Sequence, residues 1–320
     1  PGQQGKAQFS GSDSYEYTLE MVTGGAIGGG AQFRVSIDGG QTWLKDDNGQ
    51  DRIFNANLEN GSVRAGALDI WFDAGTVVAG DKFTISPKSD VYWIEPTIGP
   101  LNISTQIFSN GIMNSQRITG GSLGGYLEFR DYRVGEYRDR LQAFTESLAW
   151  ETNRLHSQGA GMTPLTSELS TYKVGRDNVP LGAPEALFKW SDKLQSGNIT
   201  FAVYGADGKP VIPYPGSAAL SSINFNPATD SLQDVAGAIN AVTFTDNQGN
   251  SHTPFTAIIY DGKLQVSTNT NPYSTPPSMY SFAISADTTG LAAGLGLNTF
   301  FSGETPGSFG VRGELATNLN

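Results

Sequence analysis

The longest periodic pattern in the chain lies between Asp131 and Gln158 and predicts one long helix. Apolar residues follow one another there at steps of three, four, three and four, and the seam resumes one heptad later. This spacing keeps them on one side of a helix. The side chains of this predicted seam are Val134, Tyr137, Leu141, Phe144, Leu148 and Leu155. At ~1.5 Å per residue such a helix is roughly 42 Å long.

Residues 1–95 alternate between apolar and polar positions and predict an all-β module. The expected strands cover residues 15–22, 32–37, 41–44, 52–54, 67–72 and 81–86. The sequence Asp38-Gly39-Gly40 between two of these runs is typical of a hairpin turn. Five to seven short strands at this spacing favour a small sandwich or barrel.

Residues 166–294 predict a second module that combines strands with one short helix. The strands are expected at residues 198–204, 223–225, 255–260, 263–267 and 281–284, and Asp261-Gly262 is expected to form a tight turn between two of them. Asp230 or Ser231 can cap the helix. The apolar residues of that helix face one way and are Leu232, Val235, Ala236 and Ile239.

Pro96, Gly99 and Pro100 indicate a linker between the first module and the long helix. We therefore divide the chain into a β-rich outer module (1–95), a linker with the long helix of a stalk (96–165), a second α+β outer module (166–294), and a return segment toward the stalk with a tail (295–320). The predicted fold class is α+β, mainly β, with two β-rich modules attached to a long-helix stalk segment.

Composition narrows the classes of partner. The net charge of −11 argues against nucleic acid, because phosphate recognition requires an excess of Lys and Arg. The chain has no cysteine, which excludes disulfides and cysteine-based zinc sites. No apolar run reaches the ~20 residues of a membrane-spanning helix, and no signal peptide is visible. Because the chain begins at Pro1 without Met, we expect it to be a fragment.

The two histidines, His156 and His252, do not favour catalysis. Ser157 follows His156, but neighbouring residues on a helix point in different directions, so a catalytic triad is not indicated. In the last turn of the helix, His156 is placed to offset the negative end of the helix dipole. His252 lies in a polar segment, and we expect it to be solvated.

Three other segments resemble functional sites only in part. Residues 45–51 lack the glycine position and the distal Glu of a calcium loop, so a hairpin turn between Leu44 and Ile53 is expected there. Residues 24–30 are rich in glycine, but a strand and not a helix follows them, so a flexible connection is expected in place of a nucleotide site. Paired acids flank aromatic residues at Asp69 and Asp73 and at Glu16 and Glu20, and alternation explains both pairs as outward-facing strand residues.

The segments around the long helix carry a resemblance to a known family. The entry GGSLGGYLEFRD (120–131) and the exit WETNRLHSQG (150–159) resemble the central helix of the flagellar hook-associated protein family FlgK. This likeness is continuous over about residues 119–161 and patchy afterwards. Two later segments agree with it: TDSLQDVAGAIN (229–240) resembles a short motif of hook-associated surface domains, and LGLNTFFSG (295–303) resembles the family's return toward its helical base.

The resemblance implies a structural subunit at the junction between hook and filament, extracellular in the bacterial flagellum, without catalytic residues, cofactor or metal. It implies flagellar hook protein and the second junction protein (FlgL) as partners, self-association in a ring, and an export chaperone for the full-length protein. Type III export of an unfolded chain through a narrow channel would also account for the lack of cysteine. The family's terminal helices would be missing from this central fragment.

For the predicted seam two interpretations stay open, and they are compatible. The six apolar residues either pack within their own subunit against helices outside this sequence, or they contact another subunit. The alternative function is a surface adhesin or glycan-binding protein that uses exposed aromatics such as Trp43, Trp71 and Trp93. An enzyme is the third class, and it would require a deep polar pocket with a strongly shifted acid.

Overall fold

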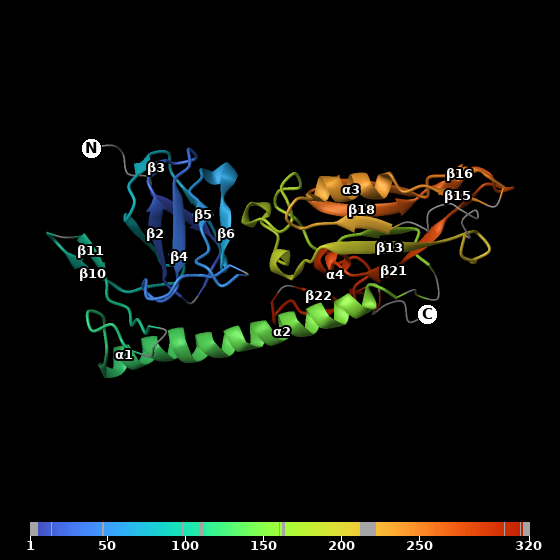
Figure 1. Cartoon of the computed structure of the whole chain (residues 1–320). Helices are drawn as coiled ribbons and strands as arrows, with labels where there is room; N and C mark the ends of the chain where they lie inside the picture. The colour runs from blue at the N-terminus through green and yellow to red at the C-terminus, as the bar shows by residue number, and fades with distance from the viewer. Residues whose placement is uncertain are drawn as a thin grey trace. The chain divides into compact units, whose positions relative to one another are not determined.

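The computed structural model describes residues 6–13, 15–46, 48–97, 99–108, 112–159, 161, 164–211, 222–246, 248–303, 305–313 and 315. These residues form a mainly β structure with one long helix, which confirms the predicted α+β class (Figure 1). The chain divides into two compact units, Pro1–Arg140 and Leu141–Asn320. The boundary falls within helix α2 (Val134–His156), so each unit holds part of that helix.

The first unit contains a β-sandwich. A four-stranded sheet has the order β5-β4-β2-β9 and a three-stranded sheet has the order β1-β7-β6, while β3 and β8 form a small pair. The core lies between the two larger sheets, where the rings of Phe33 and Phe72 meet edge to face at 5.2 Å. The strands are β1 (Ala7–Ser10), β2 (Tyr17–Thr23), β3 (Gly25–Ala26), β4 (Gln32–Ser36), β5 (Phe54–Asn55), β6 (Val63–Ala65), β7 (Leu68–Phe72), β8 (Thr76–Val77) and β9 (Lys82–Ile85), with a 3-10 turn at Glu59–Gly61.

Two local predictions for this unit are wrong. Residues 41–44 do not form a strand, because the carboxylate of Asp38 accepts the N–H groups of Gln41 and Thr42 and closes a turn. The glycine-rich segment 24–30 is an ordered turn and not a loose connection. It pairs β3 with β8, and the N–H of Ile27 donates to the carbonyl of Gly75.

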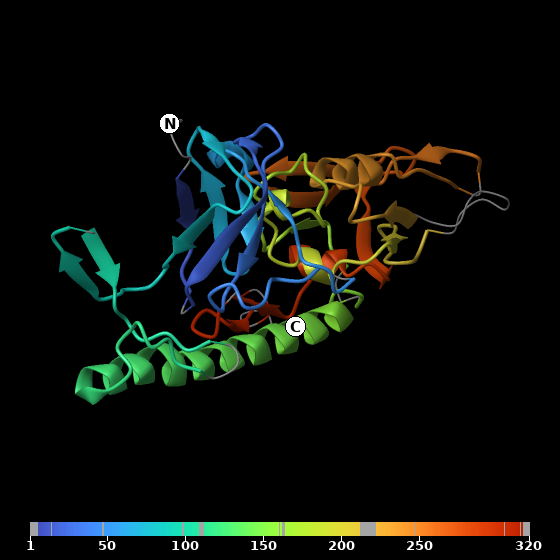
Figure 2. The same cartoon turned by 60° about the vertical axis from the view of Figure 1, so that its left-hand side comes forward.

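The expected linker after the sandwich is a hairpin. Strand β10 (Tyr92–Glu95) pairs antiparallel with β11 (Gly99–Asn102). Pro96 therefore lies in the connection of the hairpin, and Gly99 and Pro100 belong to its second strand. Figures 1 and 2 both show the hairpin standing apart from the sheets of the first unit.

The long helix begins ten residues before the predicted start. Helix α1 (Gly121–Glu128) leads through a π-helical turn (Phe129–Arg133) into α2 (Val134–His156). Glycine has a low helix propensity, which is why the sequence pattern placed the start at Asp131. One of these glycines lies in close packing, since a Cβ on Gly124 would approach the side chain of Ile118 to 3.1 Å.

The second unit packs two three-stranded sheets around one core, with orders β12-β18-β17 and β14-β13-β21. Small pairs join β15 to β16, β19 to β20 and β22 to β23. The strands are β12 (Ser167–Leu169), β13 (Gly197–Tyr204), β14 (Ser222–Phe225), β15 (Phe244–Thr245), β16 (Ser251–His252), β17 (Phe255–Tyr260), β18 (Lys263–Thr268), β19 (Thr270–Asn271), β20 (Ser278–Met279), β21 (Ser281–Asp287), β22 (Phe301–Ser302) and β23 (Gly310–Val311).

The helical parts of the second unit follow the sequence signals closely. Helix α3 (Leu232–Asn240) begins with a capping box in which Ser231 and Asp234 bind each other's backbone N–H, and its predicted apolar face is buried. Asp261 and Gly262 both have positive φ and form the predicted turn between β17 and β18. The remaining elements are α4 (Leu291–Leu295) and two 3-10 turns, Pro184–Ala186 and Ser191–Lys193.

Candidate assembly surface

The helix α1–α2 exposes a line of large apolar side chains. All six residues of the predicted seam lie on it, with exposed fractions from 38% at Leu148 to 72% at Tyr137. Three more large apolar residues, in α1 and the π turn, are exposed to a similar extent. The sequence pattern missed them because it placed the start of the helix too late. We call the whole set the exposed stripe: Leu123, Tyr126, Phe129, Val134, Tyr137, Leu141, Phe144, Leu148 and Leu155.

The π-helical turn helps to bring the two parts of the exposed stripe together. Phe129 and Val134 are five residues apart, and in a regular helix this step leaves them ~140° out of line. A π turn closes its hydrogen bonds from i to i+5 and is wider, so five residues come closer to one full turn. The π turn therefore reduces the angle around the helix axis between Phe129 and Val134.

The opposite side of α2 is buried in the second unit. Ala149 and Asn153 are each 2% exposed, and the indole of Trp150 stacks on that of Trp190 at 5.5 Å. Lys189 reaches the carboxylate of Glu146 at 3.0 Å. One side of the helix therefore packs within its own subunit, while the exposed stripe carries no such cover from the described residues.

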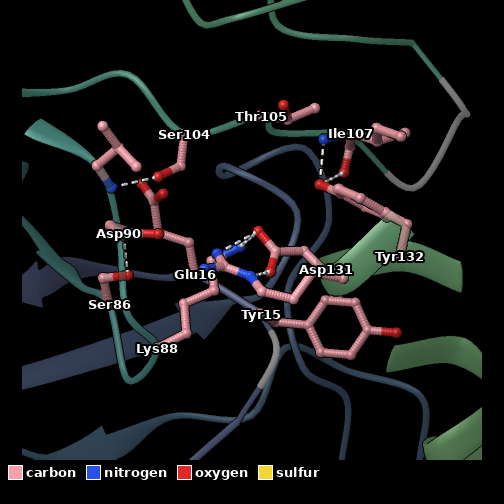
Figure 3. Close-up of polar contacts among 12 residues, drawn as sticks. Tyr15, Glu16, Ser86, Lys88, Asp90, Ser104, Thr105, Ile107, Asp131 and Tyr132 are labelled. Carbon is pink, nitrogen blue, oxygen red and sulfur yellow. Dashed lines mark hydrogen bonds and ion pairs between the residues drawn. The ribbon is translucent and has the colours of Figure 1, made fainter. Parts of the chain in front are cut away.

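A buried ion pair fixes the helix entry in the first unit (Figure 3). Lys88, which follows β9, contacts the carboxylate of Asp131 in the π turn at 3.3 Å, and their side chains are 13% and 5% exposed. The neighbouring hydroxyl of Tyr132 accepts the N–H of Ile107 and donates to its carbonyl at 3.1 Å. Burial raises the pKa of Tyr132. The π turn thus directs the polar side chains of Asp131 and Tyr132 inward, while the apolar residues on either side of them, Phe129 and Val134, stay exposed.

A second buried pair lies close to the first. The guanidinium of Arg117 donates to the carboxylate of Glu16 at 3.0 Å, and both side chains are mostly buried. Tyr15 lies beside this cluster in Figure 3, and its pKa is raised to about 12 by burial and then by Asp139 of α2. Buried ion pairs add little net stability, because desolvation offsets attraction, but breaking one is costly. We therefore infer that the two buried ion pairs orient the helix relative to the sandwich within this unit.

The base of the β10–β11 hairpin belongs to the same polar region. Asp90 accepts hydrogen bonds from the hydroxyl of Ser86 and, at 2.6 Å, from the amide of Asn102. Ser104, 1% exposed, accepts the N–H of Val91 at 2.7 Å. These bonds join the ends of the two strands to each other, and Ser86 connects Asp90 to the segment that follows β9, as Figure 3 shows for Asp90 and Ser104.

The end of α2 holds the segment that follows α4. Asn153 binds the backbone of Phe300 and Phe301 through its side-chain amide. The Nδ1 atom of His156 lies 2.9 Å from the carbonyl of Asn298, whose own amide donates to the carbonyls of Ser157 and Gly159. The two sequence motifs at 150–159 and 295–303 are thus partners in one contact, so His156 has a structural role.

The prediction that His252 is solvated is wrong. It is 3% exposed, its Nε2 atom lies 3.0 Å from Asp246, and its Nδ1 atom contacts the hydroxyl of Tyr280. Its ring stacks on Phe244 at 4.6 Å. Burial raises the pKa of Asp246, but hydrogen bonds from Asn250, His252 and Gln248 outweigh this and lower it below the ordinary value. The polar neighbours of His252 in sequence concealed these long-range contacts.

The other segments considered for chemistry have structural partners. In the 45–51 turn, Asp51 binds Arg34 and Lys45 at 2.9 and 2.6 Å, and Asp47 lies outside the described residues. Asp69 contacts Arg64 at 3.4 Å, and Arg34 covers the ring of Trp43 at 4.0 Å. Within the described part of the chain, no three His, Asp or Glu side chains are grouped to hold a metal ion.

The region that carries this surface matches one known family. Residues 89–167 match the family model described as the flagellar hook-associated protein FlgK helical domain. They include the hairpin, the π turn and the whole exposed stripe. No curated protein matches the chain. Among the described residues, no helix is both long and apolar enough to cross a membrane. The chain therefore contains, at residues 89–167, a helical domain of the flagellar hook-associated protein FlgK family.

Proposed function

We propose that this structural protein of the flagellum joins hook to filament, and that the exposed stripe is the surface by which it packs into the assembly. The single observation that carries the proposal is the line of nine large apolar side chains left bare on a helix whose other side is buried. Contiguous exposed apolar surface of this length marks an interaction site in proteins that are not themselves membrane-bound. A helix with apolar residues at three- and four-residue spacing is covered best by other helices.

The proposed mechanism is geometric and needs no catalytic group. The stripe would be covered by helices, either of the same subunit or of its neighbours, and the β-rich modules would make lateral contacts in a ring. The partners proposed are flagellar hook protein on one side and FlgL on the other, with an export chaperone for the full-length protein. The protein would lie outside the cell, with its two outer modules on the surface of the assembled tube.

The glycan-binding alternative has lost one of its supports. It relied on free aromatic faces, and Arg34 occupies one face of Trp43. Titration of the protein with oligosaccharides tests what remains of that alternative, and saturable binding would support it.

The test of the junction role uses the full-length protein in its host. Phe144→Asp and Tyr137→Asp place a charge in the stripe at positions that are 64% and 72% exposed, so the stability of this chain by itself should change by no more than about 0.5 kcal/mol. The matched control is Tyr260→Asp on β17, which is 74% exposed and lies outside the stripe. Circular dichroism verifies folding, and electron microscopy of the cells counts filaments.

We expect the two stripe variants to fold and to be exported, yet to leave most hooks without filaments. The control should give normal filaments. Normal filaments on cells that carry a stripe variant would overturn the role of the stripe, and normal filaments after deletion of the gene would overturn the junction role itself.

A further inference from the structure

Asn48 and Gly49 form the tip of a tight turn in the first unit. The carboxylate of Asp46 accepts the N–H groups of Asn48 and Gln50 at 2.9 and 2.8 Å. The carbonyl of Asp46 accepts the N–H of Gly49 at 3.0 Å. Asn48 and Gly49 are exposed, and a Cβ on Gly49 would meet no described atom within 4 Å. Little therefore opposes a local rotation of the tip once the hydrogen bond from Gly49 opens.

An Asn that precedes a Gly can react with its own backbone. The glycine nitrogen attacks the carbonyl carbon of the Asn side chain, and the new C–N bond closes a five-membered succinimide ring. The side-chain nitrogen leaves as ammonia with the proton that the glycine nitrogen gives up. Water then opens the ring at either carbonyl, which yields aspartate or isoaspartate and adds one negative charge. Glycine favours the attack, because it has no Cβ to obstruct the nitrogen and its backbone rotates freely.

The structure distinguishes this site from the second described Asn-Gly pair, Asn60-Gly61. That pair lies in the 3-10 turn Glu59–Gly61, where the N–H of Gly61 donates to a backbone carbonyl at 2.8 Å. The carbonyl of Gly61 accepts the amide of Asn57 at 3.1 Å, and a Cβ on Gly61 would approach the side chain of Asn57 to 2.8 Å. Attack requires rotation of the bond that leads to the glycine nitrogen. The contacts of Gly61 oppose this rotation at Asn60.

The second unit repeats the turn with a different residue before the glycine. The carboxylate of Asp246 accepts the N–H groups of Gln248 and Asn250 at 2.8 Å each. The carbonyl of Asp246 accepts the N–H of Gly249 at 3.0 Å. Gln248 would have to close a six-membered ring, which forms much more slowly, so this turn should persist. The chain thus contains a natural comparison for the reaction at Asn48.

We propose that Asn48 is a modification site, which converts spontaneously to aspartate and isoaspartate in the folded protein. Asn is one of the thermolabile residues of proteins. Isoaspartate carries the backbone through the side-chain carbon, which lengthens the tip by one atom and separates the two N–H groups that Asp46 holds. The turn becomes more negative and less tightly bonded in modified molecules, so the site records the age of each copy. This inference does not depend on the proposed function.

The experiment follows both Asn-Gly pairs in one sample of the folded full-length protein. The protein is incubated at mildly alkaline pH in water enriched in heavy oxygen. Trypsin then releases residues 46–52, which contain Asn48, and residues 53–64, which contain Asn60. Ring opening incorporates one heavy oxygen atom, so mass spectrometry recognises newly formed product, and fragmentation assigns the label to one residue. Asn48→Gln copies the turn of the second unit and is the matched control, and a sample in concentrated urea removes the effect of the fold.

In the folded protein we expect Asn48 to acquire the label about ten times faster than Asn60, because only the tip of the turn opens easily. In urea the two rates should differ by less than about twofold, because the contacts of Gly61 are lost there. Asn48→Gln should abolish the label in residues 46–52. Equal rates at Asn48 and Asn60 in the folded protein would overturn the inference. No label at Asn48 in the folded protein would also overturn it, because the turn would then protect Asn48.

Discussion

The side-chain amide of Asn153 binds both backbone polar groups of Phe301. Its Oδ1 atom accepts the N–H of Phe301 at 2.8 Å, and its Nδ2 atom donates to the carbonyl at 3.0 Å. The same Oδ1 also accepts the N–H of Phe300 at 3.0 Å. A single buried side chain thus gives the end of α2 the hydrogen-bonding pattern of a neighbouring strand, and it fixes a segment that lies far away in sequence.

Replacement of this side chain should therefore be costly. Asn153→Ala removes the partner of three part-buried backbone groups, and we expect a loss of about 1–3 kcal/mol in the free energy of unfolding. Urea unfolding measures the loss. The control Asn224→Ala alters an exposed side chain on β14 and should cost less than about 0.5 kcal/mol. Equal effects of the two substitutions would contradict the role given to Asn153.

The Lys88–Asp131 pair should behave as a coupled unit. Asp131→Ala removes the carboxylate that Lys88 contacts, which leaves a buried ammonium without this partner and typically costs about 3–5 kcal/mol, while Arg130, the other partner of Asp131, is 46% exposed and remains hydrated. The double variant Lys88→Met with Asp131→Leu removes both charges and should regain most of this loss. A double-mutant cycle from urea unfolding gives the coupling energy. Glu136→Ala breaks the exposed pair with Arg140 and is the control, with an expected change below about 0.5 kcal/mol. Additive effects at Lys88 and Asp131 would show that the pair is not coupled.

Deletion of Arg133 should close the π turn into a regular helix. Loss of one residue rotates Asp131 by ~100° relative to Asp139. Asp131 can then no longer contact Lys88 while Asp139 contacts Tyr15. The free energy of unfolding of the first unit should therefore fall by about 2 kcal/mol or more, while the helical circular dichroism signal stays nearly unchanged. Arg133→Ala keeps the chain length and should be almost neutral. A deletion variant as stable as Arg133→Ala would show that the extra residue has no structural role.

Alkaline pH should weaken the second unit through Tyr280. This residue is 1% exposed, and burial and then Asp246 raise its pKa to about 12 from 10. A raised pKa favours the neutral phenol in the folded state, so its contribution is complete below pH 10 and is lost as the pH rises toward 12. The loss amounts to roughly 2–3 kcal/mol.

The variant Tyr280→Phe should remove this part of the pH dependence. At neutral pH it should cost about 1–2 kcal/mol, because the Nδ1 atom of His252 loses its buried partner. Thermal unfolding between pH 7 and 12 measures both effects. Tyr260→Phe, at a position that is 74% exposed, is the control and should leave the pH profile unchanged. A profile of Tyr280→Phe that matches the wild type would refute the assignment.

The parts of the fold that the sequence predicted are those with local signals. Alternation located β17 and β18, the Asp261-Gly262 pair located their turn, and Ser231 marked the start of α3, because each signal depends on residues only a few positions apart. The stripe on α2 belongs to the same class, since helical periodicity places its members on one side.

The contacts that the sequence did not predict join distant residues. Arg117 and Glu16 are 101 positions apart, and only the folded first unit shows that they form a pair. His252 was misjudged for the same reason, because Tyr280, which contacts its ring, lies 28 positions away in the sequence. The early start of the helix was missed because glycines with low helix propensity fill its first turns, and Gly124 packs closely against Ile118, which precedes the helix in the chain.

The contact between Asn298 and the end of α2 has a further consequence. The amide of Asn298 lies 3.0 Å from the carbonyl of Gly159, so the chain leaves the helix and comes back to it at nearly the same point. Everything between those two positions behaves as a cassette with adjacent ends, a form of insertion that chains tolerate well. Foreign domains with similarly close termini should therefore be exchangeable at this site if they also cover the indole of Trp150, which stacks on Trp190 of the cassette.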